Sequence, residues 1–579
     1  MSKIFSATAT SQGLTVKAYS GDRCAMLAFD LADHLTDKLA GFAIRRAPNG
    51  TDKWQWLGNR LSFDGAYTKS ADQTGSKFYD SNVAPFQKFW WLDFPPDGVA
   101  GTFRYEVTAM RFTADKSPQL TEGEQVEVVI DVGPFTEGNI EVAFTRGYLS
   151  SQAYADEFHN QPYQPSPQGK DGWKFDWTPY LPKWTWLGGH ARQTIVDFFN
   201  EIHAEEGATL DAFVYDLNEP EIITAFIDLA AKGKLRLLAD NATLHAPSTD
   251  AGKAFVDIQN AASAGTKNDF QRGKFGRFQH NKVLIKRVGG VATKVLMGST
   301  NFSITGLYVN ANHVLVFNDA QVAAKYATAF DAAFKDELSL RAFHDDEISM
   351  KEYPINEAGM PALVVTFAPH ENPQISLKRV LDAIDGADSS VIFAVMDLNG
   401  QGEVLKALSQ LHGDEKVFSY GISDSVNADD DTINGTTVFT PSSKGGELVY
   451  SKANPEKFPP PFSSEMEVHG PAAHIVHHKF VVVDFNGTNP VVFVGSSNLA
   501  EGGEKLNGDN LMAVYDRAIA TAFAIEGIRL VDHYAFAEAL KKAGSNAQPL
   551  RLKFDGEKWW SRYYTANDIR EKERKLFSR

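Results

Sequence analysis

Two short segments of the chain each place a histidine two residues before a lysine. The first is His280 with Lys282, and the second is His477 with Lys479. Histidine changes charge near neutral pH, so one imidazole can attack a phosphorus atom while another protonates the leaving oxygen. Lysine adds positive charge for the non-bridging phosphate oxygens. The two pairs therefore supply the groups that a two-step displacement at a phosphodiester requires, with a phosphohistidine between the steps.

The two pairs belong to a longer internal repeat, in which each residue of the first copy has its equivalent 197 positions later. The register continues without a gap for over thirty residues. The other matched positions are Gly298 and Gly495, Ser299 and Ser496, Asn301 and Asn498, and Asn310 and Asn507. Repeated polar residues without a role would conflict with local consistency, which argues against two histidines that merely lie in the core. We predict catalytic roles for Asn301 and Asn498, and substrate binding by Ser299 and Ser496.

Strands are expected to carry both motifs, with helices around them. A His-x-Lys on a strand points both side chains to one face, because side chains alternate along a strand. From about residue 190 the pattern alternates between helix and strand. The expected helices are 192–206, 219–233, 376–387 and 402–413, and the expected strands are 208–217, 234–240, 389–398 and 416–422. This alternation predicts a mixed or parallel sheet with helices on its faces.

Each block resembles the signature of the phospholipase D superfamily, which is His-x-Lys followed by Asp, and then Gly-Ser-x-Asn. The resemblance covers about residues 190–540, and two copies in one chain match the two-repeat members. It implies two similar α/β lobes related by a pseudo-twofold axis, with one active site between them. It also implies a phosphodiesterase that forms a phosphohistidine and uses no metal or other cofactor.

The first difference between the copies concerns the acid of the His-x-Lys motif. Asp484 occupies this position in the second copy, five residues after Lys479, whereas the first copy has Arg287. In the superfamily this acid is usually structural, so Arg287 does not remove a reacting group. The departure nevertheless leaves open a degenerate site in an inactive scaffold protein.

The second difference lies further along the repeat. Asp509 in the second copy corresponds to Asn312 in the first. In two-repeat relatives this acid orients the histidine of the opposite lobe. We therefore expect Asp509 to face His280. Asn312, which we place among the substrate-binding residues, is expected to face His477. A carboxylate behind an imidazole fixes its tautomer and stabilises the cation formed on attack. We therefore predict that His280 is the nucleophile and that His477 is the general acid.

The rest of the chain divides into three expected regions. Residues 1–135 read as short alternating strands, which predicts an immunoglobulin- or fibronectin-like β-sandwich. Its role, structural or the docking of a protein partner, stays open. The first phospholipase D-like lobe is expected at 136–345 and the second at 346–579, where the C-terminal residues 555–579 form a strap that packs on the lobes.

Three other features leave alternatives open. Residues 160–186 contain five prolines and many aromatic residues, so we expect an ordered loop that packs on the adjacent domain or covers acyl chains or bases. Residues 267–278 interleave basic and aromatic residues, as a phosphate-guiding, base-stacking or simply solvated loop would. Asp429 to Asp431 is more typical of a solvated loop than of a calcium site.

Composition narrows the compartment and the partners. The net charge of −16 disfavours general coating of nucleic acid, although a local basic cleft remains compatible with it. The lone Cys24 allows no intramolecular disulfide and is expected in the core. There is no signal-peptide pattern and no apolar run of 18 residues. We expect a monomer in the cytoplasm, or one exported by a route that reads other signals.

The motif predicts that the substrate is a phosphodiester but does not distinguish a phospholipid from a nucleic acid. Two repeats in one chain, an acidic pI and aromatic loops favour phospholipid headgroups, with peripheral membrane contact. The basic segment before His280 favours a nuclease or another phosphodiesterase. An inactive scaffold is the third possibility, and only Arg287 and Asn312 support it.

Overall fold

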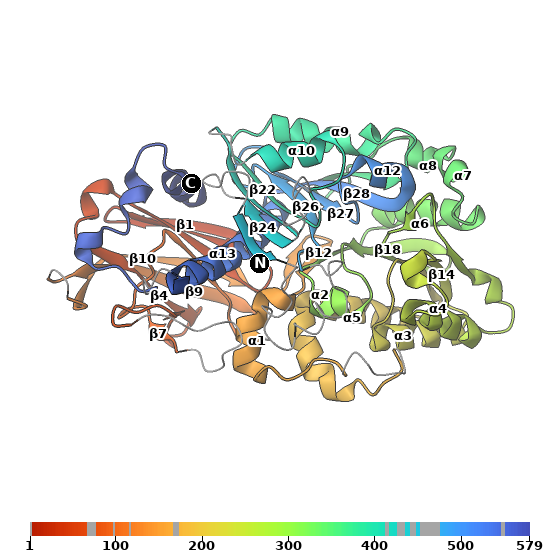
Figure 1. Cartoon of the computed structure of the whole chain (residues 1–579), viewed down its shortest axis with the longest axis horizontal. Coiled ribbons are helices and arrows are strands. Elements are labelled where there is room, and N and C mark those ends of the chain that lie inside the picture. Colours follow the sequence, from red (N-terminus) through yellow and green to blue (C-terminus); the bar gives the residue numbers. More distant parts are fainter. Residues whose placement is uncertain are drawn as a thin grey trace.

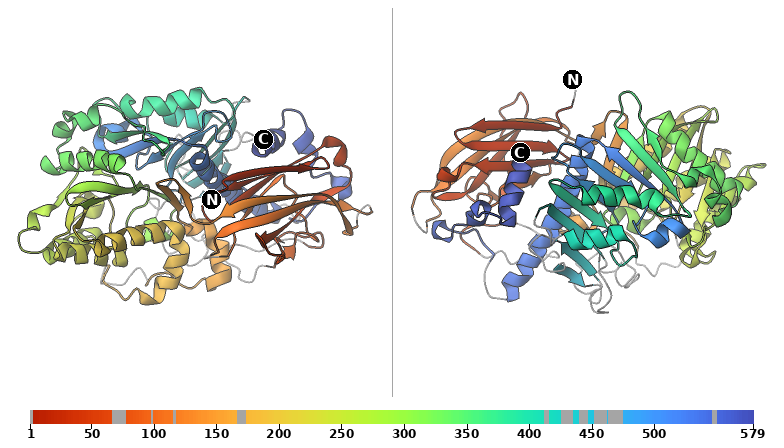
Figure 2. Two further views of the ribbon diagram at one scale, coloured as in Figure 1. Left: turned by 180° about the vertical axis from the view of Figure 1, so that it is seen from behind. Right: turned by 90° about the horizontal axis from the view of Figure 1, so that it is seen from above.

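The structure is a computed structural model that describes residues 3–65, 77–96, 99–114, 117–165, 173–411, 416–424, 435–439, 447–451, 462, 475–545 and 550–579. Figure 1 shows a β-sandwich at one end of the molecule and two α/β lobes at the other, and the two views of Figure 2 show the same arrangement. The acidic run Asp429 to Asp431 lies outside the described residues.

The N-terminal region is a sandwich of two four-stranded antiparallel sheets, as predicted. One sheet has the order β1 (Ser6–Ser11), β2 (Leu14–Ser20), β3 (Ala25–Leu31) and β8 (Trp90–Asp93). The other has the order β10 (Leu120–Val132), β9 (Gly101–Phe112), β4 (Leu39–Pro48) and β5 (Gln55–Trp56). β6 (Gly58–Asn59) and β7 (Tyr79–Asp80) form a small separate antiparallel sheet. Alternating side chains such as Leu27, Phe42 and Val107 face inward and share one buried core.

The first lobe contains an eight-stranded mixed sheet. In spatial order its strands are β11 (Phe135–Glu137), β12 (Ile140–Phe144), β19 (His313–Phe317), β18 (Val291–Gly298), β17 (Val283–Val288), β13 (Ala208–Val214), β14 (Leu235–Asp240) and β15 (Phe270–Gly273). β13, β14 and β15 are parallel to one another. The helices are α1 (Ser151–Phe158), α2 (Leu181–Ala204), α3 (Pro220–Ala231), α4 (Asp250–Ala261), α5 (Ile304–Tyr308), α6 (Ala320–Lys335), α7 (Leu340–His344) and α8 (Glu347–Met350).

The second lobe repeats this strand order. Its sheet runs β20 (Tyr353–Ile355), β21 (Ala362–Ala368), β28 (Asn507–Tyr515), β27 (Val491–Gly495), β26 (Lys479–Val483), β22 (Ser390–Val395), β23 (Phe418–Ser423), β24 (Gly435–Phe439) and β25 (Glu447–Ser451). The six strands from β12 to β14 in the first sheet therefore match the six from β21 to β23 in the second. This correspondence confirms the predicted pair of similar α/β lobes.

The strands of the second sheet are apolar on both faces because helices cover both. Val481 of β26 packs in a core with α9 (Gln374–Asp385) and α10 (Glu403–Gln410). Its neighbour Val482 points the other way, into a core that includes α13 (Arg517–Ser545). A strand buried on both faces reads as a continuous apolar run rather than as an alternating one. The remaining helix of this lobe near the site is α12 (Glu501–Leu506). Among the described residues, no helix is long and apolar enough to cross a membrane.

Helix α2 consists of two segments that meet at a kink at Gly189, where φ is 55° and ψ is −139°. The second segment agrees with the helix expected from residue 192, whereas the first, which begins at Leu181, lies where the sequence predicts a loop. Pro182 lies in its first turn, where the missing amide hydrogen costs no hydrogen bond, so proline does not exclude a helix there. Trp184 is fully buried and stacks on Tyr308, with ring centroids 4.9 Å apart. The aromatic residues around 177–186 therefore pack on the first lobe.

The sequence predicts that the C-terminal residues pack on the two lobes. In the structure they pack on the β-sandwich as well. Trp559 and Tyr563 lie in the core of the β-sandwich. The following helix, α14 (Ile569–Ser578), places Phe577 against Phe418 of the second lobe, with ring centroids 5.5 Å apart. The segment therefore joins the β-sandwich to the second lobe.

Candidate active site

A backbone hydrogen bond to the opposite lobe holds each motif histidine. β16 (Phe278–Gln279) leaves the first lobe and pairs in parallel with the start of β28, and the His280 amide donates to the Gly508 carbonyl at 2.8 Å. Correspondingly, the His477 amide donates to the Ala311 carbonyl at 3.0 Å. Gly508 follows Ala311 by the same 197 residues as the histidines. This reciprocal exchange brings both motifs to one site between the lobes.

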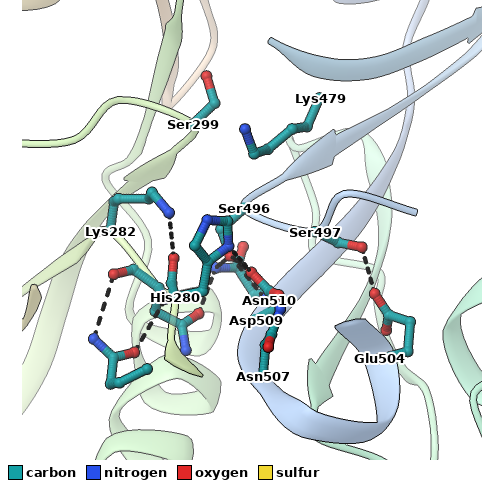
Figure 3. A network of polar contacts seen from close by, with 12 residues as sticks. His280, Lys282, Ser299, Lys479, Ser496, Ser497, Glu504, Asn507, Asp509 and Asn510 are labelled. Atoms are coloured by element: carbon teal, nitrogen blue, oxygen red, sulfur yellow. Dashed lines mark hydrogen bonds and ion pairs between the residues drawn. The ribbon is translucent and has the colours of Figure 1, made fainter. Parts of the chain in front are cut away.

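The two imidazoles differ in the group behind them. His280 Nδ1 lies 2.8 Å from Asp509 Oδ1, and Figure 3 shows the two side chains together at the site. His477 Nδ1 lies 2.9 Å from Asn312 Oδ1. Both contacts are the cross-lobe pairings expected from the sequence. Because Asp509 occupies Nδ1 of His280, the Nε2 atom is the ring nitrogen through which His280 can meet a substrate.

The two motif serines lie directly behind these partners. Ser299 Oγ donates to Asn312 Oδ1 at 2.7 Å, and Ser496 Oγ donates to Asp509 Oδ1 at 2.6 Å. Both serines are fully buried. The contacts favour a positioning role for the two hydroxyl groups over the substrate contact predicted from the sequence.

The two motif lysines point into the same space from opposite lobes (Figure 3). Lys282 Nζ donates to the His280 carbonyl, and Lys479 Nζ donates to the His477 carbonyl at 2.9 Å. Each lysine is only 1% exposed. The ammonium groups therefore lie beside the histidines of their own motifs, where a phosphate group would need positive charge.

Burial makes both lysines weaker bases than usual. It lowers the pKa of Lys282 to about 7, although Asp509 opposes the change. Burial also lowers the pKa of Lys479 well below its usual value, and the charge of Lys282 adds to the effect. Two ammonium groups in one buried site disfavour each other's charge. A bound phosphate would reverse this effect.

His280 is held in its neutral form at neutral pH. Burial and the nearby Lys282 charge lower the pKa of His280 to about 4, against the opposing effect of Asp509. Burial alone would raise the pKa of Asp509, but His280 and Lys282 lower it overall. Asp509 is thus an anion that accepts the Nδ1 hydrogen of a neutral imidazole. This tautomer leaves a lone pair on Nε2, as a nucleophile requires.

The asparagines of the two repeats have similar surroundings. Asn301 follows β18, which lies next to β17, the strand that begins after Lys282. Asn498 follows β27, which lies next to β26, the strand that begins at Lys479. Each buries an amide Oδ1 that has no hydrogen-bond partner among the described residues. An amide can present either its oxygen or its NH₂ group after a half-turn. The two amides are therefore suited to a ligand such as phosphate.

Tyr215 and Met396 are site residues that the sequence reasoning missed. The ring of Tyr215 lies 4.7 Å from the His280 ring, and Lys282 Nζ lies 4.7 Å from its centroid. Met396 Sδ lies 3.8 Å from Lys479 Nζ. The available signal was a second repeat, Val-Tyr-Asp-Leu-Asn at 214–218 and Val-Met-Asp-Leu-Asn at 395–399. Its offset of 181 differs from that of the main repeat.

Two aspartates at strand ends hold the peptide that precedes each histidine. Asp240, the last residue of β14, accepts from the Gln279 amide at 2.7 Å. Asp424, directly after β23, accepts from the Val476 amide at 3.0 Å and from the Ile475 amide. Both carboxylates are buried. They fix the backbone from which the two imidazoles project.

The motif acid and its replacement have different structural partners. Asp484 accepts hydrogen bonds from the amides of residues 388–390 at 3.0, 2.7 and 2.9 Å, which supports the structural role expected for it. Arg287 instead pairs with Asp211 at 2.6 Å and with Asp331 at 2.9 Å. Asp211 is 1% exposed, so Arg287 compensates a buried charge. The substitution changes the support of the sheet and removes none of the groups at the site.

Most of the basic segment before His280 contributes to structure. Phe270 and Phe275 are buried. Arg277 Nε donates to Asn507 Oδ1 at 3.1 Å, and Arg272 donates to the His245 carbonyl. These contacts favour a packed segment over a free phosphate guide.

His478, which separates the second histidine and lysine, lies in the interface between the lobes. Its Nε2 lies 3.2 Å from Glu526 Oε1, and its Nδ1 lies 3.2 Å from His313 Nδ1. His313 in turn lies 3.2 Å from Ser299 Oγ. This buried chain supports the side of the site that carries His477.

The fold and the site agree with a known protein family. A family model described as "Cardiolipin synthase, PLD-like domain" matches residues 201–334 and 380–526. Each matched segment contains one His-x-Lys motif. The chain belongs to the phospholipase D superfamily. Members of this superfamily are phosphodiesterases or phospholipid-modifying enzymes.

Solved structures of other phospholipase D superfamily members show distant similarity. Phosphatidylserine synthase from Haemophilus influenzae Rd KW20 is 14% identical, with a TM-score of 0.40, over 62% of this chain and 92% of that one. Nuc from Salmonella typhimurium is 18% identical, with a TM-score of 0.20, over 26% and 87%. Yeast tyrosyl-DNA phosphodiesterase is 10% identical, with a TM-score of 0.29, over 55% and 86%. At these scores the likenesses carry no argument about substrate. No curated protein matches the chain in sequence.

Proposed function

We propose that this superfamily member cleaves or exchanges phospholipid headgroups through a phosphohistidine on His280. The observation that carries the proposal is the unequal pair of cross-lobe contacts, a carboxylate behind His280 and an amide behind His477. The carboxylate stabilises the imidazolium that attack creates, whereas the neutral amide does not oppose the loss of a proton. The two histidines therefore take different roles in the same reaction.

In the first step His280 Nε2 attacks the phosphorus atom, and the bond from phosphorus to the leaving oxygen breaks. His477 donates a proton to that oxygen, so that the headgroup leaves as a neutral alcohol. Lys282 and Lys479 stabilise the charge on the non-bridging oxygens. The product is a phosphoramidate between His280 and the phosphatidyl group.

In the second step water attacks the same phosphorus atom. His477, now neutral, accepts a proton from the water, and the phosphorus–nitrogen bond breaks to restore His280. An alcohol in place of water would give headgroup exchange by the same route. The nucleophile, the general acid and base, and the two cations in both steps belong to this chain.

The overall charge favours a lipid over a nucleic acid as substrate. The net charge of −16 repels nucleic acid at long range.

The substrate is tested by incubating the protein with vesicles of phosphatidylcholine or phosphatidylethanolamine and, separately, with single- and double-stranded DNA. Each incubation is run with and without EDTA. We expect release of the headgroup in EDTA, and loss of that release in His280→Ala and His477→Ala. His34→Ala, at an exposed position of the β-sandwich, is the matched control. Cleavage of DNA alone would contradict the lipid substrate, and activity that EDTA abolishes would contradict the mechanism.

A further inference from the structure

A large cavity lies away from the two His-x-Lys motifs, where the β-sandwich, the start of the first lobe, α13 and the C-terminal segment meet. Its volume is about 1070 Å³. Figure 1 shows α13 between the β-sandwich and the second lobe, and contacts of α13 with both β2 and β22 agree with this. Neither His280 nor His477 lines the cavity.

The walls of this cavity carry an excess of positive charge. The basic residues on the described lining are Arg23, Arg60, Lys88, Arg146, Arg529, Arg551, Lys553, Arg562 and Arg570, and the acidic ones are Asp22, Glu157, Glu526 and Asp532. Five of the nine basic residues already pair with acids: Lys88 with Asp532, Arg529 with Glu526, Arg551 with Glu557, Arg562 with Asp568, and Arg570 with Glu573. Asp22 pairs with His190. The positive excess therefore comes from Arg23, Arg60, Arg146 and Lys553, against Glu157, in a chain with a net charge of −16. It indicates an anionic ligand.

Two arginines on the walls have unused donors. Arg23 and Arg529 each bury an Nε–H group without a hydrogen-bond partner among the described residues. A buried donor without a partner costs free energy. Arg60 lies over the ring of Phe78 at 5.3 Å, and Arg146 over that of Trp186 at 4.9 Å. These aromatic contacts hold the guanidinium groups at the cavity wall.

The size and the apolar lining argue for more than a small anion. Cavities of this volume hold ligands of drug size, far larger than a single phosphate. Aromatic side chains such as Phe86, Trp91, Trp186 and Trp559 make up much of the wall between the charges. A ligand with a charged head and an apolar body would contact both kinds of surface.

We propose that this cavity is a second ligand site, which binds an amphiphilic anion with a phosphate or carboxylate head and an acyl-length apolar chain. The arginines bind the head, and the aromatic residues bind the chain. The site is distinct from the one that contains His280 and His477, and the proposal does not depend on the reaction that occurs there.

The test is calorimetric titration of the full chain with dodecyl phosphate below its micelle concentration. Dodecanoate tests a carboxylate in place of the phosphate head. Inorganic phosphate tests the head without the chain, and dodecyl maltoside tests the chain without a charged head. We expect binding of dodecyl phosphate, dodecanoate or both, at least tenfold tighter than that of the two partial probes. In Arg23→Gln/Arg60→Gln the affinity should fall at least tenfold, whereas Arg341→Gln, at an exposed position of the first lobe, should leave it unchanged.

Two further variants keep the test decisive. Lys282→Met/Lys479→Met removes the charges of the candidate active site and should not change the affinity. Arg146→Gln replaces the double arginine variant if circular dichroism shows that the latter does not fold. No binding to the unmodified protein, equal binding of inorganic phosphate or dodecyl maltoside, unchanged affinity in the arginine variants, or loss of binding in the lysine variant would each overturn the proposal.

Discussion

His280 Nδ1 lies 2.8 Å from Asp509 Oδ1, although the two residues are 229 positions apart and belong to different lobes. The equivalent contact on the other side joins His477 to the neutral Asn312. The repeat is therefore symmetric in its backbone and asymmetric in its charge. This asymmetry is the physical basis for assigning attack on phosphorus to His280 and proton donation to His477.

Asp509→Asn is expected to lower kcat by about 10²- to 10⁴-fold, because the imidazolium formed at His280 loses its carboxylate and the required tautomer is no longer enforced. Steady-state kinetics on the accepted substrate measure the effect. The matched variant is Asn312→Asp, which adds a carboxylate behind His477 instead. We expect it to retain more activity than Asp509→Asn. A larger loss in Asn312→Asp would contradict the assignment.

The pH dependence of kcat/KM should have two limbs. Because His280 must be neutral to attack and has a pKa of about 4, activity should rise as the pH increases through this value. Because Lys282 stabilises charge only when protonated and has a pKa of about 7, activity should fall above that value. Lys282→Arg should move the alkaline limb upward, since guanidinium stays charged. An alkaline limb that does not move in this variant would exclude Lys282 as its cause.

Binding of a phosphate analogue at pH 8 should take up protons. Burial lowers the pKa of both Lys282 and Lys479, so a dianion placed between them should raise both values and draw protons from the buffer. Calorimetric titration with tungstate in two buffers of different ionisation enthalpy measures the uptake. The uptake should be smaller in Lys282→Met. An observed enthalpy that is independent of the buffer would show that the lysines keep their charge in the empty site.

The equivalent residues of the two copies could be matched from the sequence because the repeat keeps a single offset from His280 to Asn312. Within this stretch no loop changes length, so equivalent residues of the two copies can be matched by position alone. The resemblance to the phospholipase D superfamily, applied to these matched positions, implied the two similar lobes and the contacts of Asp509 and Asn312 across them.

Outside that stretch the offset changes, so that equivalent residues of the two copies cannot be matched by position alone. Tyr215 and Met396 are 181 residues apart, and Asp240 and Asp424 are 184 apart, because the connections between the strands differ in length. The partners of Arg287 could not be predicted either, since Asp211 and Asp331 come from other elements of the lobe. Contacts of the C-terminal segment with the β-sandwich depend on tertiary packing that local pattern does not encode.

Glu504→Gln is expected to stabilise the protein at pH 8 and to have little effect at pH 5. Burial, with a contribution from Asp509, raises the pKa of Glu504 from 4.5 to about 7, and the residue is 1% exposed. Because the folded state disfavours the ionised acid, stability is lost as the pH rises from about 4.5 to 7. The loss above pH 7 is about 3 kcal/mol at most.

Ser376 and Ser497 both donate to Glu504, so part of this gain will be offset by a changed hydrogen bond in the glutamine variant. Thermal unfolding at the two pH values measures the difference. Glu206→Gln, at an exposed position, is the control. A change in Tm of equal size at pH 5 and pH 8 would show that ionisation of Glu504 is not the cause.

The central claim is that His280 carries the phosphoryl group between the two steps. Rapid quenching of the reaction at high pH, where phosphohistidine survives, followed by peptide mass spectrometry, locates the modified residue directly. We predict a phosphatidylated peptide that contains His280 in the unmodified protein, and none in His280→Ala. Modification of His477 in the unmodified protein would contradict the account.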